Sequence, residues 1–127
     1  MIHHIDFAVT DFARSRDFYV QALAPLGMAA VIEFQREDGV KLAGFGSLPD
    51  PVFWIREGGP LQGRLHVAFL ADSRATVDTF HAAALAAGGK DNGSPGLRPR
   101  YGDHWYAAFV LDLDGHNIEA VCRKAGV

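Results

Sequence analysis

The sequence lacks several features that would point to particular classes of protein. It has a single cysteine, Cys122, so no internal disulfide can form, and we expect a reducing, cytoplasmic location. It has no excess of basic residues, since the formal net charge is −3, which argues against a nucleic-acid partner. No apolar run approaches the ~20 residues of a membrane helix. The first residues also lack the basic and apolar segments of a signal peptide, so we expect no membrane partner.

The remaining composition is that of an ordinary globular protein. The chain has 127 residues, of which 49% are hydrophobic and 21% charged, enough to form one domain around a real core. Only Gly58-Gly59-Pro60 resembles a break. We therefore predict a single domain over residues 1–127, with a first module over about 1–60 and a second over about 61–127.

The two halves are related by an internal repeat. When the sequence is shifted by 62 positions it matches itself without gaps, and His4 falls on His66. Alanine-rich composition explains some of the matches, but paired His, Phe and Gly positions are harder to attribute to chance. These further pairs are Phe7 with Phe69, Phe18 with Phe80, and Gly27 with Gly89. Such a repeat predicts two copies of one supersecondary unit.

Each copy has the pattern of a β-α-β-β-β unit. β-branched and aromatic residues predict opening strands over 2–9 and 64–71, each followed by an amphipathic helix. The cap candidates are Thr10 or Asp11 for the first helix and Asp72 or Ser73 for the second. Short strands are then predicted over 29–36, 40–46 and 51–56 in the first copy, and near 90, over 104–111 and over 116–123 in the second.

Two features of the second copy mark its turns. Asp114-Gly115 predicts a tight hairpin between the last two strands. Residues 92–102 are rich in Gly, Pro and Arg, which predicts a loop.

Three side chains have the chemistry of a metal site. Equivalent strands would carry His4 and His66 at equivalent points and direct both imidazoles toward a common cleft. Glu119 lies in an apolar run, Ile-Glu-Ala-Val-Cys, where an unpaired carboxylate would be costly to bury. Two imidazoles and one carboxylate suit one divalent ion, which could be iron, manganese, nickel, cobalt or zinc, and leave coordination positions free for substrate.

The sequence resembles the vicinal-oxygen-chelate superfamily along nearly the whole chain. The resemblance lies in His-Ile-Asp-Phe-Ala-Val-Thr-Asp with Arg-Asp-Phe-Tyr near the start, in Leu-His-Val-Ala-Phe at 65–69, and in the closing hairpin at 109–121. Leu113 stands where the family usually has proline. The superfamily includes glyoxalase I, bleomycin-resistance proteins, fosfomycin-resistance enzymes and extradiol dioxygenases.

The resemblance implies an α+β fold of two paired β-α-β-β-β modules that form an open, cupped mixed β-sheet. It also implies a homodimer, with Glu119 as a metal ligand and with ligands that in some members come from both chains. Glyoxalase I has a fourth ligand, a glutamate in the fourth strand. An ungapped repeat would place Glu57 there, whereas alignment on the turns places Trp54 or Ile55 there, and we favour three ligands.

Aromatic and basic residues near the predicted loop are candidates for a substrate pocket. An arginine there would suit an anionic or carbonyl-bearing substrate, and pockets combine aromatic walls with few polar anchors. We predict substrate contacts from Trp54, Arg98, Trp105 and Tyr106, and a catalytic proton-transfer role for His104 or Tyr101. Ordinary packing and solvent exposure are the competing interpretations.

Three functional hypotheses follow. The first is a metal-dependent lyase, isomerase or dioxygenase that chelates adjacent oxygens of a small molecule. The second is a metal-free protein that sequesters a drug or metabolite, of the bleomycin-resistance type. The third is a regulatory or scaffolding domain without turnover, because fold alone does not fix function.

Overall fold

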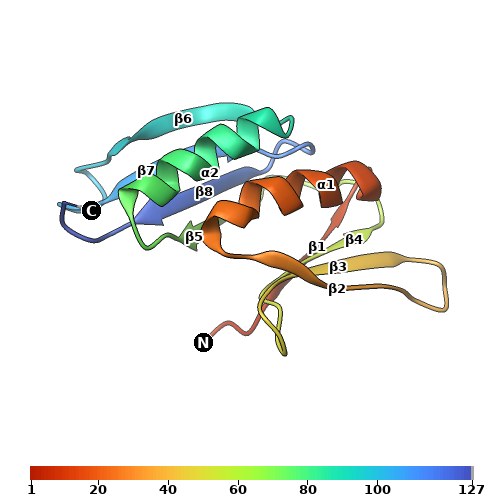
Figure 1. Ribbon diagram of the computed structural model, residues 1–127. Coiled ribbons are helices and arrows are strands. Elements are labelled where there is room, and N and C mark those ends of the chain that lie inside the picture. The colour runs from red at the N-terminus through yellow and green to blue at the C-terminus, as the bar shows by residue number, and fades with distance from the viewer. Residues whose placement is uncertain (127) are drawn as a thin grey trace.

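The chain folds as two β-α-β-β-β modules in a computed structural model, which describes residues 1–126 (Figure 1). The first module has β1 (Ile5–Val9), α1 (Phe12–Leu23), the short 3-10 helix η1 (Ala24–Leu26), β2 (Ala29–Gln35), β3 (Lys41–Gly46) and β4 (Phe53–Glu57). The second has β5 (His66–Leu70), α2 (Arg74–Ala86), β6 (Lys90–Leu97), β7 (Tyr106–Leu111) and β8 (Asn117–Cys122). The predicted α+β architecture is confirmed.

Each module forms its own open sheet of four strands. The strand orders are β1-β4-β3-β2 and β5-β8-β7-β6, in which the first pair is parallel and the others are antiparallel. In Figure 1, α1 and α2 lie next to each other, the β5–β8 sheet lies behind α2, and the β1–β4 sheet lies below α1. Neither sheet closes into a barrel.

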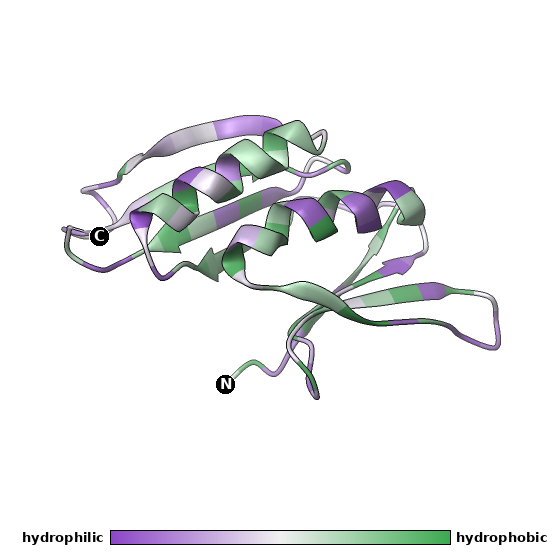
Figure 2. Ribbon diagram, in the orientation of Figure 1, coloured by the Kyte–Doolittle hydropathy of each residue, from purple (hydrophilic) through white to green (hydrophobic). Residues whose placement is uncertain are grey.

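The helices begin at two of the predicted caps. The Asp11 carboxylate accepts a hydrogen bond from the Arg14 amide at 3.1 Å, and the Ser73 hydroxyl accepts one from the Thr76 amide at 3.1 Å. Each helix turns its apolar residues toward a common core, and Figure 2 shows these green segments alternating with purple ones along α1 and α2. The core therefore belongs to both modules, with Phe53 of β4 meeting Phe69 of β5 at 5.2 Å between ring centroids.

Residues 92–97 were predicted as a loop, and this was wrong because they belong to β6. The glycines and proline are tolerated because β6 is an edge strand with irregular pairing around Gly93, and Pro95 has no amide to donate. Other strands also begin later than predicted, among them β1 at Ile5, β5 at His66 and β7 at Tyr106. Within residues 1–126, no helix has the length and apolar content needed to cross a membrane.

Candidate functional site

Two of the three predicted ligands meet on the second sheet. His66 opens β5, and Glu119 lies on the neighbouring strand β8 opposite Ala68. Alternation places both side chains on the face of the sheet that points away from α2. His66 Nε2 and Glu119 Oε1 are 2.9 Å apart, although 53 residues separate them in the chain.

The Glu119 carboxylate is buried and hydrogen-bonded. Only 3% of the residue is exposed, and its second oxygen accepts a hydrogen bond from Trp105 Nε1 at 3.2 Å. Trp105 itself lies between Tyr101, at 5.9 Å between ring centroids, and Arg123, whose guanidinium is 5.4 Å from the indole ring. These contacts fix the orientation of the carboxylate and provide the hydrogen bonds without which its burial would be costly.

His4 lies apart from this pair. It precedes β1, is exposed, and its Nδ1 is 2.9 Å from His3 Nδ1. It lines a groove on the first sheet with Asp6, Asp50 and Trp54, whereas His66 lines a different pocket. Among residues 1–126, no three His, Cys, Asp or Glu side chains of one chain form a group that could hold a metal ion.

The sheet register shows which residue of the first module corresponds to Glu119. Asp6 pairs with Trp54 in β1–β4 as Ala68 pairs with Glu119 in β5–β8. Trp54 therefore occupies the equivalent position, as the alignment on turns placed it. Its indole lies against Gly44, where an added Cβ would come within 2.9 Å of the ring. Glu57 lies three residues later, exposed at the strand end.

Tyr106 points to the opposite face of the sheet from Glu119. Its hydroxyl donates to Asp78 of α2 at 2.6 Å, and the Arg74 guanidinium lies 5.2 Å from its ring. The hydrogen bond to Asp78 is the main cause that raises the pKa of the Tyr106 phenol. Tyr106, for which we predicted a substrate contact, links β7 to α2 through this hydrogen bond.

The loop candidates differ in their surroundings. Arg98 lies over Phe109, with its Cζ 5.5 Å from the ring centroid, and the Phe109 ring is 6.1 Å from the His66 ring. Tyr101 is 52% exposed, and its ring contacts the Trp105 ring and the Arg100 guanidinium. His104 is exposed in the turn before Trp105.

The pocket beside His66 has a volume of about 440 Å³. Its lining includes three residues that the sequence did not single out, Asn92, Leu111 and Asn117. Alternation could have found Asn117, since it lies two residues before Glu119 on the same strand. Asn92 was hidden by the incorrect loop prediction.

Comparison with known proteins agrees with this fold. The family model of the Glyoxalase/Bleomycin resistance protein/Dioxygenase superfamily matches residues 1–120. The chain belongs to this superfamily. A glyoxalase/bleomycin resistance protein from Albidiferax ferrireducens T118 is 28% identical, with a TM-score of 0.76 over 98% of this chain and 99% of that one. No curated protein matched significantly.

Two more distant superfamily structures share the fold. A fosfomycin resistance protein, FosX, from Listeria monocytogenes, solved with Mn(II) and sulfate, is 20% identical, with a TM-score of 0.68 over 98% of this chain and 93% of that one. A glyoxalase I mutant from Zea mays is 21% identical, with a TM-score of 0.73 over 94% of this chain and 46% of that one. At these identities the likeness concerns the fold alone.

Proposed function

We propose that the protein is a metal-dependent enzyme that acts on a small molecule with adjacent oxygens, by lyase, isomerase or dioxygenase chemistry. One observation carries the proposal, the convergence of the His66 imidazole and the buried Glu119 carboxylate beside a pocket. An imidazole nitrogen and a carboxylate oxygen are the donors that divalent iron, manganese, nickel, cobalt and zinc accept in proteins. The chemistry of the pair therefore fits such an ion.

The third ligand in this proposal is His4 of a second copy of the chain. His4 is exposed and lines a groove of its own, so each chain offers one pair of ligands and one separate imidazole. A symmetric dimer in which each His4 reaches the partner's pair would complete two equivalent sites. Trp54 lines the same groove as His4, so the copy that contributes His4 would also bring an aromatic wall.

The roles of the chain's own residues follow from their contacts. A bound divalent ion would supply the Lewis acidity that stabilises negative charge on substrate oxygens. Trp105 holds Glu119 in place through its indole N–H, which keeps the carboxylate aimed at His66. Both proton-transfer candidates are exposed, and Tyr101 is the better placed because its ring contacts that of Trp105, which holds Glu119.

The pocket size suits this activity. Its volume of about 440 Å³ falls in the range of about 300–1,000 Å³ that small-molecule sites occupy.

Metal titration tests the proposal. We expect one ion per chain on titration with iron, manganese, nickel, cobalt or zinc, and no binding by the double variant His66→Ala with Glu119→Ala. His81→Ala is the matched control, because His81 lies on α2 and pairs with Asp91. A folded protein that takes up none of these ions would overturn the metal site.

A sequestering function is the second candidate, and one observation favours it. The groove on the first sheet carries an aromatic pair, exposed Phe34 and half-buried Trp54, with ring centroids 6.2 Å apart, and Leu42 beside them. Such a surface can stack a flat apolar ligand. Tryptophan fluorescence quenching by an aromatic ligand in metal-free protein, lost in Trp54→Leu, would support this function in place of the enzyme.

A further inference from the structure

A second, basic pocket lies next to the pocket of His66. Its volume is about 230 Å³, and it shares Asn92 and Asn117 with the pocket of His66. The two pockets thus adjoin, and Phe109 links them because its ring contacts both His66 and Arg98. The remaining lining residues of the basic pocket are Gly93, Arg100 and Tyr101.

The Arg98 guanidinium folds back over β6, the strand that ends just before it. Its Nη2 donates to the Ser94 carbonyl at 2.7 Å, and its plane lies above Phe109. Glycines make this position available. A Cβ at Gly93 would come within 3.3 Å of Nη2, and one at Gly96 would come within 3.1 Å of Nη1. An arginine that is already fixed binds an anion at a lower entropic cost than a freely moving one.

Within residues 1–126, no carboxylate neutralises the positive charge of this pocket. Over residues 1–126, neither Arg98 nor Arg100 forms an ion pair with a carboxylate. The nearest acid along β6, Asp91, is occupied by His81 of α2 and by the Gly93 amide. The His81 hydrogen bond is the main cause that lowers the pKa of Asp91.

Amide groups complete the polar lining. Asn92 Nδ2 donates to Asn117 Oδ1 at 3.2 Å, which leaves each amide further hydrogen-bonding capacity. Two guanidinium groups with neighbouring amides and an aromatic floor match the planar or tetrahedral oxygens of an oxyanion.

We propose that the basic pocket binds the oxyanion group of a small organic substrate, a carboxylate or a phosphoryl group, through Arg98 and Arg100. The adjoining pocket would then hold the rest of that molecule beside His66. This second step rests on the proposed function, whereas binding of the anion does not require the metal.

The first experiment is an NMR titration of metal-free, isotope-labelled protein with inorganic phosphate and, separately, with acetate. We expect saturable shifts of the signals of Arg98, Asn92 and Asn117 with at least one anion, and the anion that binds more tightly identifies the head group. Arg98→Gln should weaken binding about tenfold or more, as expected for loss of a charge-assisted contact. Arg14→Gln, the same charge change on α1, should not.

A second variant tests the geometry while the charge is kept. Gly96→Ala places a methyl group against Arg98 Nη1, the end of a flexible side chain, so the fold tolerates it but the guanidinium must move. We expect weaker anion binding in this variant. No saturable binding of either anion, or equal binding by wild type and Arg98→Gln, would overturn the proposal. His66→Ala with Glu119→Ala should still bind the anion, which separates this site from the metal site.

Discussion

The Trp105 indole sets the orientation of the Glu119 carboxylate. It donates to Glu119 Oε2 at 3.2 Å while His66 occupies Oε1. Trp105→Phe keeps the ring but removes the donor, so one carboxylate oxygen becomes free to turn. We expect metal affinity to fall about tenfold, the lower end of the effect of losing a partner of a ligand. Isothermal titration calorimetry measures it.

Tyr106→Phe is the matched control for this prediction. It also keeps an aromatic ring and removes its hydrogen-bond donor, but the Tyr106 hydroxyl donates to Asp78 on the opposite face of the sheet from Glu119. Its metal affinity should equal that of the wild type. If Trp105→Phe also retains full affinity, Glu119 does not depend on the indole for its orientation.

Individual residues also show what the sequence could predict of the site. His66 was identified by the repeat and Glu119 by its place in an apolar run and by the family resemblance, and the structure brings them together. The sequence did not show which face of the sheet Tyr106 occupies, and strand alternation puts it with the helix-facing residues once Phe109 is known to oppose Glu119. That pairing is a property of the sheet, and no local signal in the sequence contains it.

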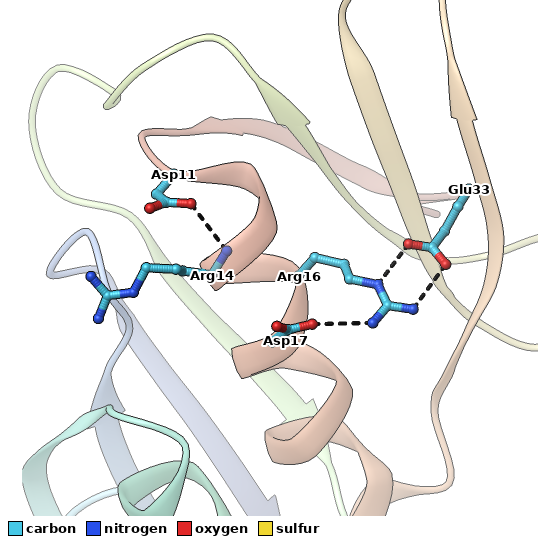
Figure 3. Close-up of polar contacts among 5 residues, drawn as sticks. All are labelled: Asp11, Arg14, Arg16, Asp17 and Glu33. Atoms are coloured by element: carbon cyan, nitrogen blue, oxygen red, sulfur yellow. Dashed lines mark hydrogen bonds and ion pairs between the residues drawn. The ribbon is translucent and has the colours of Figure 1, made fainter.

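At the level of elements, α1 is joined to β2 by an ion pair on the surface. Arg16 donates to both oxygens of Glu33, at 2.7 and 3.0 Å, and also contacts Asp17 (Figure 3). The hydrogen bond from Arg16 is the largest of the effects on Glu33 and lowers the pKa of its carboxyl group. The folded state therefore gains stability from ionised Glu33.

The pH dependence of that gain has a definite sign. Because the folded pKa of Glu33 is below the usual value of about 4.3, the stability is present above that value and is lost as pH falls through the folded pKa. Glu33→Gln should cost less than about 1 kcal/mol at pH 7, since both side chains are partly exposed. The two proteins should become equally stable in acid, as measured by urea unfolding.

Glu37→Gln is the control for this ion pair. Glu37 is exposed in the turn between β2 and β3, and no ion pair to it is recorded among residues 1–126. Its substitution should change stability less than Glu33→Gln at pH 7. A loss for Glu33→Gln that persists at the same size in acid would mean that the ion pair is not its cause.

The helices were predicted well, because their apolar residues recur at a clear helical spacing. Both helices begin at predicted caps because Asp11 and Ser73 combine a capping side chain with an apolar stripe that follows. β6 was missed because Gly and Pro normally break a strand, and only the position of β6 at the sheet edge makes them tolerable. The position of a strand at the sheet edge depends on how the other strands pair, so the local sequence of β6 does not predict it.

At the scale of the whole molecule, a buried hydrogen bond joins the two modules beside their shared core. Tyr19 of α1 donates to Asp112 Oδ2 at 2.5 Å, in the turn that leads to β8. Burial, followed by the charge of Asp112, raises the pKa of the Tyr19 phenol, so it stays protonated and donates. Tyr19→Phe should destabilise the protein by about 1–3 kcal/mol, because Asp112 loses a donor in the interior. Urea unfolding measures this loss.

Tyr101→Phe provides the comparison, since the Tyr101 side chain is 52% exposed and should contribute little to stability. Equal stability of Tyr19→Phe and wild type would show that the amides of Asp114 and His116, which donate to Oδ1, are sufficient for Asp112.

Subunit mixing addresses the molecule as an assembly. If His4 completes the partner's site, His4→Ala and Glu119→Ala homodimers should each lack a complete ligand set. Co-expression of the two variants should restore roughly a quarter of the sites, because half of randomly formed symmetric dimers are mixed and each has one intact site. Metal analysis of the mixed preparation gives the fraction. No restoration in verified heterodimers, or a metal-loaded monomer in sedimentation, contradicts the shared site.

Each sheet is built from one continuous half of the chain, since β1 to β4 end at Glu57 and β5 begins at His66. Strand pairing in the first half needs nothing from the second, so it can proceed during synthesis, before the second half leaves the ribosome. The apolar faces of the helices are buried only when the two halves meet. Phe18 of α1 and Phe80 of α2 both belong to the core that the two halves share. Before the halves dock, the apolar helix faces of a nascent chain are therefore open to chaperone binding and to aggregation.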